Sequence, residues 1–255
     1  MCGIFFSIWN SSTDNKKINS ITKAFNLLNH RGPDNKKLIK GNNWSLGHTR
    51  LSIIDVNNRS NQPFTDNDKR YFLSFNGEIY NYIDIKSNLE NKGIIFNTNS
   101  DTEVLFKSLT NYGLEKTLKS IRGMFSFIFF DSVSKTLYGA KDHLGQKPFH
   151  YSFQDNMFSV ASEVPVLLEL QSSITPDLIS WRTYLCSNGI IEKDRTFFKN
   201  IKTLPSGHFL KFQNGKLQVN EYFNILELHD QNNNLYRKSN KKNIVEKLHF
   251  YIKQS

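Results

Sequence analysis

Cysteine is scarce in this chain of 255 residues, which holds only Cys2 and Cys186. Two cysteines cannot build a disulfide framework, and neither stands in a CxxC pair of the type that binds zinc. No stretch approaches the roughly 18 consecutive apolar residues of a membrane-spanning helix. The first ten residues lack the basic start and the long apolar segment of a secretion signal. We therefore exclude the disulfide-rich secreted and membrane-spanning classes, and expect a cytoplasmic globular protein without a metal site.

The chain also lacks the glycine-rich phosphate-binding motifs of nucleotide-binding folds, and no repeat at solenoid spacing is visible. Its net charge of +10 is compatible with nucleic-acid binding, but the lysines are spread along the whole sequence. The one denser basic run, 237–242, lies in a polar stretch typical of a solvated linker. No signature of a nucleic-acid-binding domain accompanies it. We expect neither nucleic acid nor a membrane as a partner.

What the chain has is enough apolar sequence, 38% of its residues, to bury a substantial core in one large domain. Apolar patterning predicts helices at 19–29, 82–93, 100–113, 163–170 and 177–185, and an amphipathic helix at the C-terminus carrying Val245, Leu248 and Ile252. It predicts strands at 4–9, 44–48, 51–56, 71–75, 124–131, 135–141, 148–153, 157–161, 207–212 and 216–222. Two sheets with helices outside would bury such a set.

Cys2 directly follows the initiator Met1, which aminopeptidases remove before small residues. The mature chain would then begin with Cys2, whose α-amine, with a pKa of about 7.7–8.0, is partly neutral near physiological pH. Such an amine can take the proton of its own thiol and yield the reactive thiolate. Taken alone, Met-Cys favours the ordinary explanation, a small residue that happens to stand second. Cys186 lies in an apolar helix and is expected to be a buried, inert thiol.

Other candidate residues have ordinary explanations when each is taken singly. Asn76-Gly77 after a strand is typical of a hairpin turn. Asp101 follows Ser100 in a Ser-x-x-Glu capping box, where an acid gains from the helix dipole. Arg50 is by default a surface arginine, and the histidines at 48, 143 and 208 have no metal-ligand spacing.

Together, a series of sequence blocks resembles the class II glutamine amidotransferases. The first blocks in chain order are 2–4 (CGI), 31–34 (RGPD), 48–55 (HTRLSIID), 62–63 (QP), 76–81 (NGEIYN) and 100–103 (SDTE). Later blocks are similar to the glutaminase half of asparagine synthase B: 123–127 (GMFSF), 142–148 (DHLGQKP), 161–163 (ASE) and 205–208 (PSGH). The resemblance covers roughly residues 2–222, and Lys141 departs from it where the family usually has arginine.

The resemblance implies a role for each matching residue. Cys2 corresponds to the nucleophile, and Asn76 with Gly77 to the oxyanion hole that stabilises charge on the attacked amide oxygen. Arg50 corresponds to the residue that holds the α-carboxylate of glutamine. Asp101, helped by Glu78, corresponds to the group that binds the α-ammonium. The remaining residues implied in glutamine binding are Leu51, Ser52, Ile53 and Ile54.

The implied fold is α+β, the four-layer α/β/β/α sandwich of N-terminal nucleophile hydrolases. The implied amidotransferase domain is 2–222, and 223–255 is expected to be a linker and first helix leading to an ATP-dependent synthetase domain. That domain would use ATP and Mg²⁺, with channelled ammonia, to convert aspartate to asparagine. The amidotransferase domain itself is expected to need no cofactor, and a homodimer is possible.

Several alternatives stay open at this point. The synthetase domain's Ser-Gly-Gly-x-Asp-Ser motif is absent, so the chain is either truncated, which we favour, or free-standing. Related architectures amidate other carboxylates, and the residues that choose the acceptor are absent. A silent glutamine-binding module is a further alternative, although the intact Cys2, Arg50, Asn76 and Asp101 argue against it.

Overall fold

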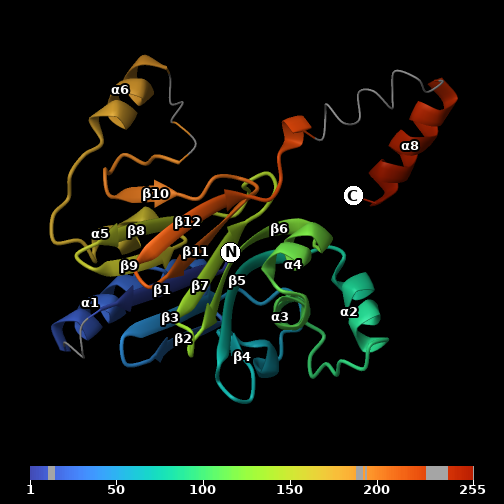
Figure 1. Ribbon diagram of the computed structural model, residues 1–255, viewed down its shortest axis with the longest axis horizontal. Helices are drawn as coiled ribbons and strands as arrows, with labels where there is room; N and C mark the ends of the chain where they lie inside the picture. The colour runs from blue at the N-terminus through green and yellow to red at the C-terminus, as the bar shows by residue number, and fades with distance from the viewer. Residues whose placement is uncertain (11–14, 188–191, 193, 228–240, 255) are drawn as a thin grey trace. The chain divides into compact units, whose positions relative to one another are not determined.

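The structure is a computed structural model that describes residues 1–10, 15–187, 192, 194–227 and 241–254. The chain divides into two compact units, Met1–Tyr222 and Phe223–Ser255. In the first unit, two antiparallel sheets of six strands lie face to face, with helices on their outer sides (Figure 1).

Sheet A consists of β1 (Gly3–Trp9), β2 (Asn35–Lys40), β3 (Trp44–Arg50), β8 (His150–Gln154), β9 (Met157–Ala161) and β10 (Ile201–Thr203). Its spatial order is β10-β8-β9-β1-β3-β2, so that the N-terminal strand is central. Sheet B consists of β4 (Phe64–Thr65), β5 (Tyr71–Ile79), β6 (Gly123–Asp131), β7 (Thr136–Lys141), β11 (His208–Gln213) and β12 (Lys216–Glu221). Its order is β12-β11-β7-β6-β5-β4.

The core between the sheets follows from the two-residue period of the strands. Along β1, Ile4, Phe6 and Ile8 join the cluster that sheet A shares with sheet B. The intervening Phe5 and Trp9 join a separate cluster with the helices of the other face. A strand buried on both faces in this way is expected where helices cover the outer side of its sheet.

Helices complete the outer layers. On sheet A lie α1 (Asn15–Asn26) and α5 (Val164–Leu168), and on sheet B lie α2 (Tyr82–Glu90), α3 (Asp101–Tyr112) and α4 (Leu114–Ser120). The layer order is therefore α/β/β/α, as expected from the resemblance. The strands β2, β4 and β10 and the helix α4 were not expected from the apolar pattern, because all four are short or largely polar.

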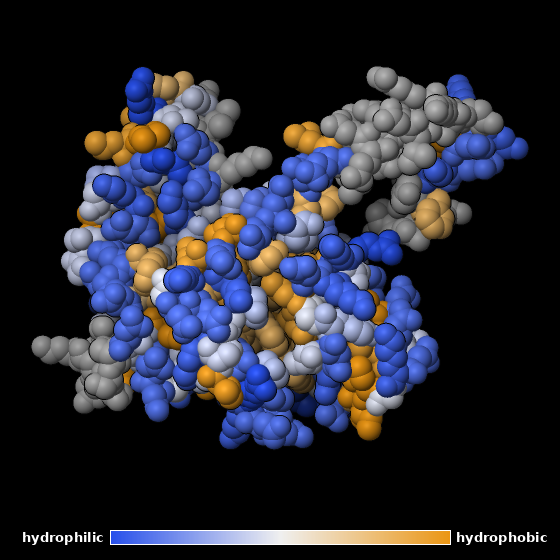
Figure 2. Space-filling model, in the orientation of Figure 1, coloured by the Kyte–Doolittle hydropathy of each residue, from blue (hydrophilic) through white to orange (hydrophobic). Residues whose placement is uncertain are grey.

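Four local expectations were wrong. Asn76 and Gly77 form no hairpin turn, because both lie within β5 and pair with β6. Residues 51–56 form a loop rather than a strand, because the guanidinium of Arg50 binds backbone carbonyls in that loop. Ser100 does cap α3, but Glu103 accepts from the backbone N–H groups of Asn97 and Thr98 rather than closing the box. Cys186 is exposed at the end of α6 (Leu178–Cys186), whose apolar side chains are largely uncovered (Figure 2).

The second unit contains the helix α8 (Lys241–Gln254), on which Val245 and Leu248 are exposed. Most of the basic run 237–242 and of the expected linker falls outside the described residues. Among the residues that are described, no helix combines the length and apolar character needed to span a bilayer.

Candidate active site

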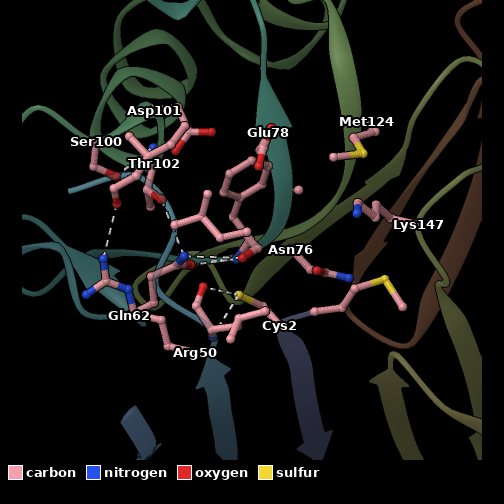
Figure 3. A pocket seen from close by; sticks show the side chains of 16 residues that line it. Cys2, Arg50, Gln62, Asn76, Glu78, Ser100, Asp101, Thr102, Met124 and Lys147 are labelled. Carbon is pink, nitrogen blue, oxygen red and sulfur yellow. Dashed lines mark hydrogen bonds between the residues drawn. The ribbon is translucent and has the colours of Figure 1, made fainter. Parts of the chain in front are cut away.

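A pocket lies at the end of the sandwich where four elements converge (Figure 3). Cys2 precedes β1, Arg50 ends β3, Asn76 to Glu78 form the last part of β5, and Asp101 begins α3. Every residue that the sequence placed in the site lines this pocket except Ser52. Ser52 donates its backbone N–H to Asp34 at 2.6 Å instead.

Cys2 is fixed at both its sulfur and its backbone. The sulfur accepts a hydrogen bond from the Leu51 N–H at 3.4 Å, and it lies 3.6 Å from the Leu51 carbonyl oxygen. The Cys2 carbonyl oxygen accepts from Nε of Arg31 at 2.9 Å, and Arg31 in turn pairs with Glu163 at 2.8 Å. The Leu51 N–H is thus a donor that would favour a thiolate at this position.

The pKa of the Cys2 thiol is raised, because burial disfavours the charged form. The Leu51 N–H and the positive charges of the N-terminus, Arg50 and Arg31 act in the opposite direction without overcoming burial. In the chain that carries Met1, burial thus favours the neutral thiol, and a base near the sulfur would promote its ionisation.

One edge of β5 carries a row of backbone donors that do not serve the β5–β6 ladder. The N–H of Phe75 donates to Oε1 of Gln62 at 2.7 Å, and the N–H of Ile79 donates to Oδ2 of Asp101 at 3.1 Å. Because backbone direction alternates along a strand, the Gly77 N–H between them faces the same edge. The side-chain Nδ2 of Asn76, a residue only 2% exposed, has no hydrogen-bond partner among the described residues.

Asn76 and Gly77 line the same pocket as Cys2, and Figure 3 shows the Asn76 side chain near Cys2. A buried donor without an acceptor costs free energy, so its presence in a pocket wall points to a ligand oxygen. Only glycine fits at position 77 without a clash, because a Cβ would lie 2.1 Å from the Met124 carbonyl oxygen and 2.6 Å from Cα of Phe125.

Two acidic side chains also line the pocket, those of Asp101 and Glu78. Asp101 is 4% exposed, and burial raises the pKa of its carboxyl group to about 6, with the neighbouring Glu78 acting in the same direction. Hydrogen bonds from the backbone of Ile79 and Thr102 limit the rise. The two carboxyl groups, of Asp101 and Glu78, would attract a ligand cation, whose binding would favour the ionised form of Asp101.

Arg50 organises the loop that follows it. Its Nη1 donates to the Asn57 carbonyl oxygen at 3.1 Å and to Oδ1 of Asn61 at 2.7 Å. Its Nη2 donates to the carbonyl oxygens of Ile54 at 3.3 Å and Asp55 at 2.6 Å. All four Nη hydrogens thus have acceptors, which leaves the Nε–H and the positive charge for a ligand.

The structure adds pocket residues that the sequence analysis did not place in the site: Gln62, Phe75, Ser100, Thr102, Met124 and Lys147. All of them except Phe75 belong to the sequence blocks that carry the family resemblance, and membership of these blocks could have identified them. Within the described parts of the chain, no group of three or more His, Cys, Asp and Glu side chains is arranged to hold a metal ion.

A family model described as "Glutamine amidotransferase domain" matches residues 1–223. The chain belongs to the glutamine amidotransferase family. It is 34% identical over 229 residues to "Asparagine synthetase [glutamine-hydrolyzing] 1" of Bacillus subtilis, covering 88% of this chain and 35% of that protein. It is 32% identical over 222 residues to "Amidase chyE" of Penicillium rubens, covering 82% of this chain and 32% of that protein.

The amidotransferase fold is also found in solved structures. The B. subtilis glutamine phosphoribosylpyrophosphate amidotransferase matches with a TM-score of 0.65 at 17% identity, over 87% of this chain and 49% of that one. This confirms the expected N-terminal nucleophile hydrolase sandwich. The glutamine amidotransferase described here spans about a third of the length of the curated relatives named above.

Proposed function

We propose that this domain hydrolyses glutamine to glutamate and ammonia, with Cys2 as the nucleophile. The observation that carries the proposal is the buried Nδ2 of Asn76, which has no hydrogen-bond partner among the described residues and lines the same pocket as Cys2 and Gly77. An attacked amide places negative charge on oxygen, and preorganised donors at that position are worth about 10²–10³ in rate each.

The chemistry begins with removal of Met1, which itself lines the pocket. The freed α-amine of Cys2 takes the thiol proton, and the thiolate attacks the side-chain carbonyl carbon of glutamine. A C–S bond forms and the carbonyl oxygen becomes an oxyanion, held by Asn76 and Gly77. The α-ammonium returns a proton to the departing nitrogen, the C–N bond breaks and ammonia leaves.

Water then resolves the γ-glutamyl thioester. The α-amine of Cys2, neutral again, takes a proton from water, and the hydroxide attacks the thioester carbonyl. The C–S bond breaks, glutamate leaves and the sulfur recovers its proton. The raised pKa of the thiol makes the α-amine necessary, because the thiol ionises little on its own.

Selection of glutamine follows from the charges around Cys2. Asp101 and Glu78 would bind the α-ammonium, and Arg50 would attract the α-carboxylate through its charge and Nε–H. The loop residues Leu51, Ile53 and Ile54 would enclose the substrate, because all three line the pocket. Glutamine carries an α-ammonium group, an α-carboxylate and a side-chain amide, so one molecule could contact all of these groups at once.

We further propose that the ammonia serves a glutamine-dependent asparagine synthase, in which an ATP- and Mg²⁺-dependent region amidates aspartate. The names of several relatives support this acceptor. A different carboxylate is the second candidate, because relatives at 32% and 31% identity are named amidases.

The test is glutamate release from glutamine by the purified chain, with its intact mass recorded. Activity that is present in the Met-free chain and absent in Cys2→Ala supports the proposal. A Met-free chain that binds glutamine without releasing glutamate would overturn it in favour of a silent module.

A further inference from the structure

The side chain of Gln62 replaces a missing strand partner next to the oxyanion site. Strand β4 ends after two residues, with Phe64 opposite Leu73 on β5. Continuing that register backwards would place Gln62 opposite Phe75, but the backbone pairing with β5 starts only at Phe64. The side-chain amide of Gln62 takes over this position.

Two hydrogen bonds join this amide to the backbone of Phe75. Oε1 of Gln62 accepts from the Phe75 N–H at 2.7 Å, and Nε2 donates to the Phe75 carbonyl oxygen at 3.2 Å. Gln62 is only 4% exposed, so the pair is shielded from competing water. A side-chain amide that both donates and accepts copies the pattern of a neighbouring strand.

A second group acts on the same carbonyl oxygen. Nε2 of His48, a fully buried residue on β3, lies 3.0 Å from the Phe75 oxygen. Burial lowers the pKa of His48 to about 3, so the ring is neutral and carries its proton on Nε2, since a carbonyl oxygen can only accept. The Phe75–Asn76 peptide is therefore held by donors from two directions.

Gln62 also contacts the helix that carries Asp101. Its Nε2 lies 3.3 Å from the hydroxyl oxygen of Thr102, the residue directly after Asp101 on α3. One side chain thus connects the strand that carries the oxyanion donors to the helix that carries the ammonium-binding carboxylate.

We propose that Gln62 is the positioning residue of the oxyanion site, because its amide fixes the Phe75–Asn76 peptide and thereby the direction of the Asn76 side chain. The inference rests on the proposed glutaminase function. Rotation of the peptide plane at Phe75 would swing the Asn76 side chain away from Cys2, and it would also tilt the Asn76 N–H, which faces β6. A misplacement of about 1 Å at a reacting group can lower the rate about 10²-fold.

The test is a double-mutant cycle between Gln62→Met and Asn76→Ala, read in kcat and KM for glutamine. If Gln62 acts through Asn76, Gln62→Met lowers kcat about tenfold or more in the parent and less than about twofold in the Asn76→Ala background. Equal losses in both backgrounds would overturn the inference. The glutaminase activity of the parent distinguishes the two possible failures. If the proposed function is wrong, the parent releases no glutamate, whereas if only the role of Gln62 is wrong, the parent is active and the two losses are equal.

Ser74→Ala is the matched control. Ser74 lies on β5 one residue before Phe75, is fully buried, and donates its hydroxyl to the Gly47 carbonyl oxygen on β3 at 2.9 Å. Loss of this hydroxyl weakens the contact between the sheets without affecting the Phe75–Asn76 peptide, so the melting temperature should fall and kcat should stay unchanged.

If Gln62→Met does not fold, Gln62→Glu is the second variant. It keeps the acceptor for the Phe75 N–H but loses the donor, and the same cycle applies. A fall in kcat for Ser74→Ala equal to that of the Gln62 variant would contradict the inference.

Discussion

The sulfur of Cys2 accepts a hydrogen bond from the Leu51 N–H at 3.4 Å, although the two residues are 49 positions apart. The contact joins the start of β1 to the end of β3, which are neighbours in sheet A. It provides a donor for the thiolate but not a base for the thiol, whose pKa is raised by burial. In the proposed mechanism, ionisation of the thiol therefore depends on the free α-amine of Cys2.

Blocking that amine should abolish activity. A chain with an uncleaved N-terminal extension has an amide nitrogen in place of the amine, and its extra residues would crowd a pocket that Met1 already lines. We expect no glutamate release from this chain and full recovery once a protease exposes Cys2. Coupled assay of glutamate, with intact mass before and after cleavage, checks this. Equal activity before cleavage would contradict a role for the amine.

The two proposed oxyanion donors should respond differently to substitution. Asn76→Ala removes a donor that has no partner among the described residues, so we expect kcat to fall about 10²-fold with little loss of stability. Gly77→Ala instead places a methyl group 2.1 Å from the Met124 carbonyl oxygen, and should destabilise the fold by about 1–3 kcal/mol or more. Thermal melts alongside kinetics separate the two. Intact stability in Gly77→Ala would show that β5 and β6 can move apart.

Glutamine binding should weaken in acid. Asp101 has a pKa of about 6 in the free protein and must be ionised to bind an ammonium group. Below pH 6 we therefore expect the affinity for glutamine to fall by up to tenfold for each pH unit. Titration calorimetry on Cys2→Ala, which binds without turnover, measures it directly. An affinity that is constant from pH 7.5 to about 5 would exclude Asp101 as the ammonium-binding group.

The Asp101 carboxyl group should also lower the stability of the protein when no ligand is bound. Its folded pKa of about 6 lies above the usual 3.8, so the cost of ionisation in the fold appears as pH rises through this interval and stays constant above it. Asp101→Asn should accordingly be more stable than the parent at pH 7.5, by up to about 3 kcal/mol. The difference should disappear near pH 4. Urea unfolding at several pH values tests this, and a variant less stable than the parent at every pH would contradict it.

Much of the fold could be predicted from the sequence because strands buried on both faces, such as 124–131, leave an unmistakable apolar run. The loop after Arg50 was misread as a strand, since its apolar residues 51, 53 and 54 line a pocket rather than a sheet. Cys186 was misread because an apolar helix was assumed to be covered, whereas α6 leaves its apolar side chains exposed.

The candidate site was predictable as a set of residues but not as a geometry. Motif blocks identified Cys2, Asn76 and Asp101, yet only the fold brings them to one pocket. The sequence could not predict that the Gln62 amide occupies the position of a strand partner for Phe75. That depends on how far the pairing of β4 with β5 extends toward Gln62. The pKa of Asp101 likewise depends on burial that no local sequence pattern encodes.

The central claim is that Cys2 is the nucleophile that attacks glutamine, and covalent labelling tests it most directly. A glutamine analogue with a diazoketone in place of the side-chain amide alkylates a thiolate only where the glutamine site holds it. Cys186 is an exposed internal control for ordinary thiol reactivity. Peptide mapping by mass spectrometry should find the adduct on Cys2 alone, and excess glutamine should prevent it. Labelling of Cys186 at the same rate, or labelling of Cys2 that glutamine does not block, would contradict the account.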